Sequence, residues 1–157
     1  MSATNPKRVI HIGSIAGQVA NLHAPLYNSG KFAITGLVRS LAGLETLGIR
    51  VNAVAPGLIK TPLWTDHPEK LKFVGQNDLW ATAEETAMAM LKCLEDEILV
   101  GGTVLEVGSG QTRVVKPFND PGPSGAGHTA SAPTVATAEV LEWLGEPGWG
   151  IRMESKL

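Results

Sequence analysis

The amino-acid sequence predicts an α/β fold built on a partial, doubly wound parallel sheet. Two short β-branched runs, at residues 8–12 and 50–55, each stop abruptly at a turn that contains glycine. Between them, apolar residues recur at helical spacing over residues 26–47. A strand, a long helix and a second strand in this order form a right-handed parallel crossover. With a helix at about 82–97 and a strand at 103–107, we expect about three strands and two main helices.

Local signals indicate where these elements begin and end. Pro25 suits the first turn of the long helix, and Gly48 suits the position just after its end. Thr82 is expected to be the N-cap of the later helix, with Glu85 completing a capping box. Asn52 lies inside the second strand, where a structural hydrogen-bond partner is more typical than a catalytic group. Capping chemistry therefore predicts the helix positions independently of periodicity.

The composition limits the classes of protein to which this chain can belong. The chain has 157 residues, enough for one moderate core, with a formal net charge of −2 and a pI near 6.1. This balance gives no support for a surface that binds nucleic acid or an anionic membrane. The single cysteine, Cys93, excludes an internal disulfide framework and a cysteine metal cluster, and its apolar helical setting favours an inert thiol. No apolar run reaches the roughly 18 residues of a membrane span, so we expect a soluble, cytoplasmic protein without a metal site.

The composition changes near the end of the chain. The first half of residues 116–157 is rich in Pro, Gly, Ser, Thr and Ala, and such a segment buries too little apolar surface to offset its ordering entropy. We therefore expect one domain at residues 1–115 and then a flexible tail, with a short helix at residues 139–145. Trp143 and Trp149 could dock on the core or on a partner, or they could belong to a frayed segment.

The residues that carry chemistry lie between Ser14 and Lys31. Ser14 directly follows the first predicted strand, at the edge where open α/β sheets bind ligands. Tyr27 and Lys31 are four residues apart near the start of the long helix, so they should share a face, where an ammonium stabilises a phenolate. A serine hydroxyl beside that phenol suits proton exchange with a carbonyl or an alcohol. Ser14 alone would favour a capping or turn role, but together with Tyr27 and Lys31 it favours the catalytic role.

Ser14, Tyr27 and Lys31 in this order and spacing, with the turn PGLIKT at residues 56–61, resemble the catalytic half of a short-chain dehydrogenase/reductase. The resemblance covers residues 7–112 and implies a Rossmann-like fold. It implies that Tyr27 is the general acid/base, that Ser14 orients the substrate oxygen, and that Lys31 assists Tyr27. It also implies a small alcohol or ketone as substrate and NAD or NADP as cofactor. The cofactor-binding residues that it implies are Tyr27, Lys31, Pro56, Gly57, Ile59 and Thr61.

The same resemblance covers only the C-terminal half of the family's domain. The family binds the rest of its cofactor with a glycine-rich turn after a first strand, and this sequence has no strand–GxGxxG–helix pattern. We therefore expect the N-terminal half of the fold to be absent. The expected function is a truncated NAD(P)-dependent oxidoreductase that interconverts an alcohol and a carbonyl. The alternative is a catalytically inactive fragment that acts as an interaction or dimerisation module through its uncovered sheet.

The resemblance also implies a substrate lid and a subunit interface. Residues 63–79 are polar, have weak periodicity and correspond to the lid. The candidate residues for lining a substrate pocket are Trp64, His67 and Phe73. Alternatively, these side chains could pack on the core and anchor the loop there. The family commonly forms a subunit interface through the long helix, so a homo-oligomer through residues 26–47 is expected. Ordinary core packing would leave the same apolar pattern.

Overall fold

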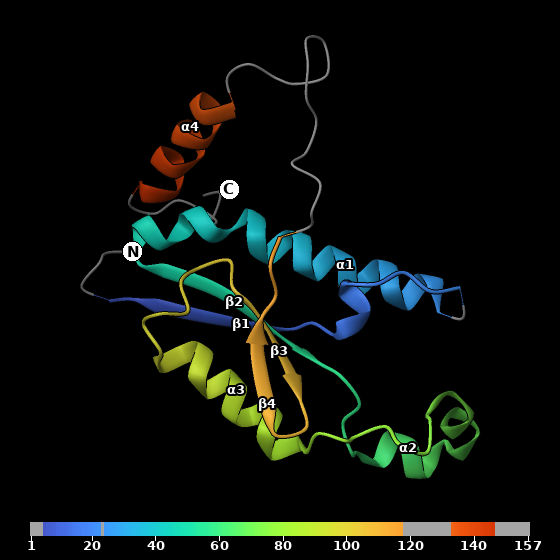
Figure 1. The fold of residues 1–157 in the computed structure, drawn as a ribbon. Coiled ribbons are helices and arrows are strands. Elements are labelled where there is room, and N and C mark those ends of the chain that lie inside the picture. Colours follow the sequence, from blue (N-terminus) through green and yellow to red (C-terminus); the bar gives the residue numbers. More distant parts are fainter. Residues whose placement is uncertain (1–4, 23, 118–132, 147–157) are drawn as a thin grey trace, which may run out of the picture.

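The structure, a computed structural model, describes residues 5–22, 24–117 and 133–146 (Figure 1). The elements in chain order, with η denoting a 3₁₀ turn, are β1 (Lys7–Ile12), η1 (Ile15–Gly17), α1 (Pro25–Ser40), η2 (Ala42–Leu47), β2 (Ile49–Pro56), α2 (Pro62–Asp66), η3 (Pro68–Phe73), α3 (Ala83–Glu95), β3 (Val104–Gly108), β4 (Gln111–Val114) and α4 (Pro133–Gly145). Among the described residues, none of these helices is long and apolar enough to cross a membrane.

The sheet has the strand order β1-β2-β3-β4. Strands β1 and β2 pair in parallel, as do β2 and β3, with Val9 opposite Val51 and Val54 opposite Leu105. The predicted α/β fold with a parallel sheet is therefore confirmed. The prediction of about three strands missed β4, which pairs antiparallel with β3. All residues of β4 are exposed and show no apolar alternation, so its sequence carries no strand signal.

Two helices cover the two faces of the sheet, α1 on one side and α3 on the other (Figure 1). The residues buried under α1 are Val38, Val51, Ala53, Ala55 and Val104. Those buried under α3 are Val54, Ala89, Cys93, Leu99, Leu105 and Val107. Successive β2 residues thus enter opposite cores, as expected for a strand buried on both faces. Burial raises the pKa of the Cys93 thiol, in agreement with an inert thiol.

The long helix ends earlier than the apolar pattern predicts. Helix α1 stops at Ser40, and the predicted continuation to residue 47 is instead the 3₁₀ turn η2. Glu45 in this turn accepts hydrogen bonds from Arg50 Nε at 2.7 Å and from the Gly101 backbone N–H at 2.5 Å. These tertiary contacts draw the segment toward the start of β2. Gly48 then adopts φ 75°, the left-handed conformation expected of a residue that closes such a turn.

Two local predictions agree with the hydrogen bonds observed. The Glu85 backbone N–H donates to Thr82 Oγ1 at 3.1 Å and the Thr82 N–H to Glu85 Oε2 at 2.7 Å, which confirms the capping box. Asn52 is fully buried, donates to the Leu99 carbonyl at 3.0 Å and accepts from the Thr103 N–H at 3.1 Å. Asn52 is therefore the structural hydrogen-bond partner that its position predicts, linking β2 to the turn before β3.

The tail prediction falls partly outside the described residues. Residues 118–132 and 147–157, Trp149 among them, are not described. Helix α4 begins at Pro133, six residues before the predicted start of this helix. A hollow between this helix and the end of α1 is lined by Ser40, Leu41, Gly43, Leu44, Val140, Leu141 and Leu144. Trp143 stays half-exposed at 48%.

Candidate active site

Ser14 lies at the carboxyl end of β1 and is 9% exposed. Its Oγ accepts a hydrogen bond from the Ala16 N–H at 3.1 Å, so Ser14 is the N-cap of η1. The same oxygen donates toward the Pro56 carbonyl at 3.5 Å, and the Gly13 N–H donates to the Val54 carbonyl at 2.7 Å. These contacts place Ser14 where the ends of β1 and β2 meet. The capping role is thus observed, and the hydroxyl stands at the edge where open α/β sheets bind ligands.

Tyr27 and Lys31 lie one turn apart in α1 and face each other. The Lys31 ammonium is 5.5 Å from the centroid of the Tyr27 ring and donates a hydrogen bond to the Ile12 carbonyl at 2.9 Å. Ile12 is the last residue of β1, so Lys31 connects α1 to the strand that leads into Ser14. Tyr27 is 54% exposed, which leaves its ring accessible to a ligand.

The turn η1 packs closely against α1. A Cβ on Gly17 would lie 2.6 Å from the Lys31 carbonyl oxygen and 2.8 Å from Thr35 Oγ1, so only glycine fits there. Asn28, 5% exposed, donates from Nδ2 to the Val19 carbonyl at 2.8 Å and holds the chain that follows η1. Sequence reasoning missed Asn28. The available signal was a polar residue directly after Tyr27, inside the predicted helix.

The turn after β2 is held by backbone hydrogen bonds. The Gly57 N–H donates to the Val107 carbonyl at 3.0 Å, and Ile59 forms a parallel bridge with Ala81. A Cβ on Gly57 would lie 3.8 Å from Ile15 Cδ1, so the turn also contacts η1. Thr61 is the N-cap residue of α2, but its side chain makes no capping hydrogen bond. Of the predicted cofactor residues, Pro56 and Gly57 therefore lie beside the Ser14 turn. Ile59 and Thr61 lie further along, at the bridge to Ala81 and at the start of α2, and the Thr61 hydroxyl is not used as a cap.

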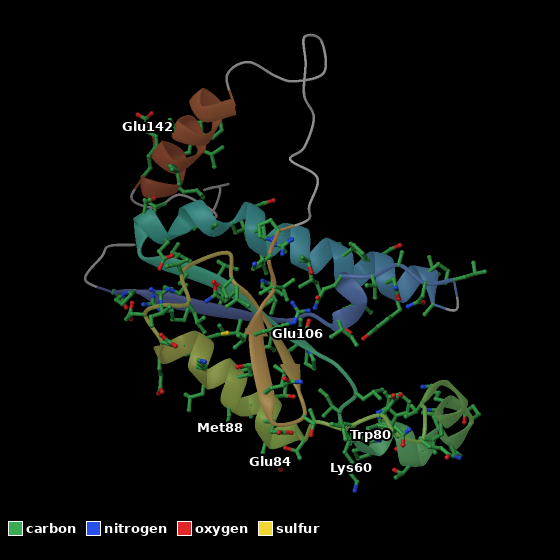
Figure 2. The ribbon with its side chains drawn as sticks, in the orientation of Figure 1. Lys60, Trp80, Glu84, Met88, Glu106 and Glu142 are labelled. Carbon is green, nitrogen blue, oxygen red and sulfur yellow. The ribbon has the colours of Figure 1, made fainter. Side chains whose placement is uncertain are left out.

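The predicted lid consists of α2 and η3, and its three candidate residues behave differently. Trp64 packs edge to face on Trp80, with ring centroids 5.0 Å apart. These two rings, with Lys60, Thr61, Thr65, Pro68 and Leu71, line a hollow of about 600 Å³. Lys60 and Trp80 are labelled in Figure 2 at the base of this lid. His67 does not line it and instead lies 3.3 Å from Glu69. Phe73 ends η3, and its side chain is not among those described.

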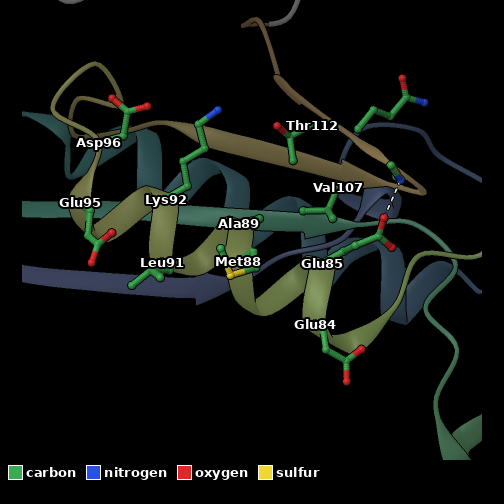
Figure 3. A pocket seen from close by; sticks show the side chains of 13 residues that line it. Glu84, Glu85, Met88, Ala89, Leu91, Lys92, Glu95, Asp96, Val107 and Thr112 are labelled. Carbon is green, nitrogen blue, oxygen red and sulfur yellow. Dashed lines mark hydrogen bonds between the residues drawn. The ribbon is translucent and has the colours of Figure 1, made fainter.

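A second hollow, of about 750 Å³, lies away from these residues, between α3 and the β3–β4 hairpin (Figure 3). Met88 and Leu91 line it from α3, and Val107 from β3. At its end the Gly110 N–H donates to Glu85 Oε1 at 2.6 Å. The hydrogen bond from the Thr82 N–H, followed by this one, lowers the pKa of the Glu85 carboxyl. None of the predicted site residues lines this hollow. Its position gives no support to a role in the Ser14–Tyr27–Lys31 chemistry.

Comparisons with known proteins find similar sequences and structures. The family model described as short chain dehydrogenase matches residues 1–72. The short-chain dehydrogenase/reductase homolog YusR of Bacillus subtilis (strain 168) is 36% identical over 115 residues, which cover 71% of this chain and 88% of that relative. Cis-4-hydroxycyclohexanecarboxylate dehydrogenase of Sinomonas cyclohexanicum is 33% identical over 120 residues, 73% of this chain and 48% of that protein.

Solved structures of dehydrogenases also match this chain over part of their length. A 7α-hydroxysteroid dehydrogenase complexed with NADH and 7-oxo glycochenodeoxycholic acid superimposes with a TM-score of 0.59 at 29% identity. The match covers 69% of this chain and 46% of that one. The chain thus spans most of YusR but only about half the length of the other relatives compared.

Proposed function

Because the chain belongs to the short-chain dehydrogenase/reductase family, we propose that it takes part in NAD(P)-dependent interconversion of an alcohol and a carbonyl. The observation that carries the proposal is the position of the Lys31 ammonium, 5.5 Å from the Tyr27 ring and bonded to the end of β1. The substrate is a small alcohol or ketone. The proposal also includes a cytoplasmic location and a homo-oligomer formed through the α1–η2 segment.

In this mechanism, each of the three residues has one task. Ser14 donates its hydroxyl hydrogen to the substrate oxygen and orients it. Tyr27, as phenolate, takes the proton of the alcohol hydroxyl during oxidation and returns it to the oxygen during reduction. Lys31 stabilises the phenolate by its charge, and its hydrogen bond to Ile12 keeps it in place. The nicotinamide, when bound, supplies or accepts the hydride at the carbon.

The residues present fit the nicotinamide end of the cofactor. The Lys31 ammonium has three N–H donors. One donates to the Ile12 carbonyl, which leaves two for ribose hydroxyls. The Thr61 side chain is not used as a cap, and the backbone of the turn from Pro56 runs beside η1. Within the described residues, no strand is followed by a glycine-rich turn that opens a helix for the pyrophosphate. The proposal therefore assigns residues to the nicotinamide end of the cofactor alone. It does not choose between NAD and NADP.

Activity assays with Tyr27→Phe test this mechanism. The purified chain is assayed with NAD(H) and NADP(H) against secondary alcohols and ketones. Loss of the phenol hydroxyl should lower kcat by about 10²–10⁴-fold, the usual contribution of a general acid/base. Ser29→Ala, which removes an exposed hydroxyl bonded to the Pro25 carbonyl in the same helix, is the matched control and should leave kcat unchanged. Equal activity of Tyr27→Phe and the wild-type chain would contradict the proposed role.

One observation favours the alternative of a non-catalytic interaction module. Strand β1 lies at the end of the strand order, and its apolar residues Val9 and Ile12 are 41% and 47% exposed. An edge strand with such residues is suited to pairing with another chain. Calorimetric titration with NADH separates the two functions. Saturable binding by the isolated chain supports the oxidoreductase, whereas no binding together with stable self-association supports the module.

A further inference from the structure

The hollow of about 750 Å³ between α3 and the β3–β4 hairpin is separate from the residues of the proposed chemistry (Figure 3). We refer to it as the α3 hollow. One side of α3 lines it from Glu84 to Asp96, and the hairpin lines it from Val107 to Thr112. A helix rises 1.5 Å per residue, so the two ends of this lining lie about 18 Å apart. The α3 hollow is therefore an elongated surface feature that follows one helix.

The middle of the α3 hollow is apolar and open to solvent. Met88 is 63% exposed and Leu91 is 39% exposed, and the two lie three residues apart, which places them on one face of α3. The buried residues Ala89 and Val107 line the hollow beside them. Exposed apolar side chains that gather in a hollow are typical of a binding surface, and a methionine side chain adapts readily to the shape of a partner. The middle is therefore suited to the apolar side chains of a ligand.

The two ends of the α3 hollow are acidic. Glu84 and Glu85 line one end, Glu95 and Asp96 the other, and the cation among the lining residues is Lys92. Four carboxylates and one ammonium give a formal charge of −3, more than the −2 of the whole chain. None of the four carboxylates forms an ion pair with a residue that the structure describes. Glu85 and Asp96 accept backbone hydrogen bonds, whereas Glu84 and Glu95 are exposed and available to a partner.

This charge selects the kind of partner. Nucleic acid and anionic membrane surfaces are repelled by the negative surplus. A second copy of the chain, docked with the same patch, would bring four further carboxylates against these four. A cationic partner is attracted instead, and the span of about 18 Å between the acidic ends matches about three turns of a helix.

We propose that the α3 hollow binds a basic amphipathic helix of a partner protein. The apolar face of that helix lies on Met88 and Leu91, and lysine or arginine side chains near its two ends meet Glu84 and Glu95. Figure 3 shows the two apolar side chains between these two carboxylates. The apolar contact supplies affinity, and the complementary charges orient the partner and speed its association. The proposal does not depend on catalysis by Ser14, Tyr27 and Lys31.

Two fluorescein-labelled helical peptides test the proposal, with binding to the full chain followed by fluorescence anisotropy. Both have about three helical turns and the same leucine face, but one has lysine at its polar positions and the other glutamate. The lysine peptide should bind saturably and at least about tenfold more tightly than the glutamate peptide. Its affinity should fall as sodium chloride is added, because salt screens the charges. Equal affinities of the two peptides, or no saturable binding of the lysine peptide, would overturn the proposal.

Substitutions on α3 locate the binding surface. Met88→Ser removes an exposed apolar side chain and should weaken binding of the lysine peptide by about tenfold, because that side chain is buried in the complex. Leu26→Ser, which removes an exposed leucine from α1 on the other face of the sheet, is the control and should leave the affinity unchanged. Equal losses in the two variants would show that the peptide binds exposed apolar residues in general, against the proposal.

A second pair of variants tests the charges. Glu95→Gln should weaken binding by about twofold to fivefold, as expected for one exposed ion pair. Glu142→Gln makes the same change of charge on α4 and should leave the affinity unchanged. Equal affinities of these two variants would contradict a local acidic site. Sedimentation of the chain without peptide examines the other occupant: self-association that Met88→Ser abolishes would assign the α3 hollow to a second copy and overturn the proposal.

Discussion

Gly17 touches the backbone of Lys31 so closely that a single added carbon atom would overlap it. The distance from the position of a Cβ on Gly17 to the Lys31 carbonyl oxygen is 2.6 Å, and to the carbonyl carbon 2.9 Å. This contact joins the turn that carries Ser14 to the helix that carries Tyr27 and Lys31. The relative position of the proposed catalytic groups therefore depends on a residue that has no side chain.

Gly17→Ala should accordingly destabilise the protein. Because the atoms that the Cβ meets are backbone, η1 must move away from α1, and we expect the free energy of unfolding to fall by about 1–3 kcal/mol. Urea unfolding followed by circular dichroism measures this change. Gly36→Ala is the matched control, since a Cβ there meets nothing within 4 Å and alanine favours a helix by about 1 kcal/mol over glycine. Equal destabilisation of both variants would contradict the tight contact.

Ser14→Ala should reduce activity more than stability. Loss of the cap on η1 costs about 0.5–2 kcal/mol, whereas loss of a donor to the substrate oxygen costs about 10²–10³-fold in kcat. Steady-state kinetics and thermal unfolding of the same preparations compare the two effects. Ser14→Thr keeps the hydroxyl and should recover part of the activity. If activity falls only in proportion to the folded fraction, Ser14 is a cap and nothing more.

The edge-to-face contact of Trp64 and Trp80 should stabilise the lid. We expect a coupling free energy of about 0.5–1.5 kcal/mol between the two rings in a double-mutant cycle of alanine variants. Urea unfolding of the four proteins supplies the values. The same cycle between Trp64 and Trp143, which lies on α4, serves as the control and should give no coupling. A Trp64–Trp80 coupling equal to the control value would rule out the stabilising contact.

Asn52→Leu should be among the most destabilising single changes in β2. The leucine removes an acceptor from the Thr103 N–H and a donor from the Leu99 carbonyl, so we expect a loss of about 2–4 kcal/mol. Denaturant unfolding measures it. Thr46→Val, which removes an exposed hydroxyl bonded to Gly43, should change the free energy by less than about 0.5 kcal/mol. If Asn52→Leu also changes the free energy by less than about 0.5 kcal/mol, the two hydrogen bonds of Asn52 do not stabilise the fold.

The Glu45 carboxylate should make stability depend on acid pH. The hydrogen bond from the Gly101 N–H, followed by the bond from Arg50, lowers the pKa of Glu45 below its ordinary value of 4.5. A carboxyl with a depressed folded-state pKa stabilises the fold above the unfolded-state pKa, and this contribution is lost as the pH falls from 4.5 toward the folded-state value. Glu45→Gln should therefore be less stable than the wild-type chain near neutral pH, and the difference should shrink on acidification.

Urea unfolding in steps from about pH 7 to about pH 3 measures this difference. Glu95→Gln, at the end of α3, is the control for removing a carboxylate and should follow the wild-type curve. A difference between Glu45→Gln and the wild-type chain that stays constant over the whole range would mean that the carboxylate charge does not contribute.

The sequence by itself determined the elements whose signals are local. The strands around residues 8–12 and 50–55 follow from β-branched runs, and α3 from the Thr82–Glu85 capping box. The shared face of Tyr27 and Lys31 follows from helix geometry alone, because residues four apart in a helix are neighbours. These features depend on interactions within a few residues, which is the range that a sequence pattern records.

The tertiary structure decided everything that depends on residues far apart in the chain. Helix α1 ends at Ser40 because Glu45 bonds to Arg50 and Gly101, and β4 forms only by pairing with β3. The contact of Gly17 with Lys31 and the pairing of Trp64 with Trp80 likewise join separate segments. A local pattern leaves no trace of such contacts, since each forms only when the packed sheet and helices bring its partners together.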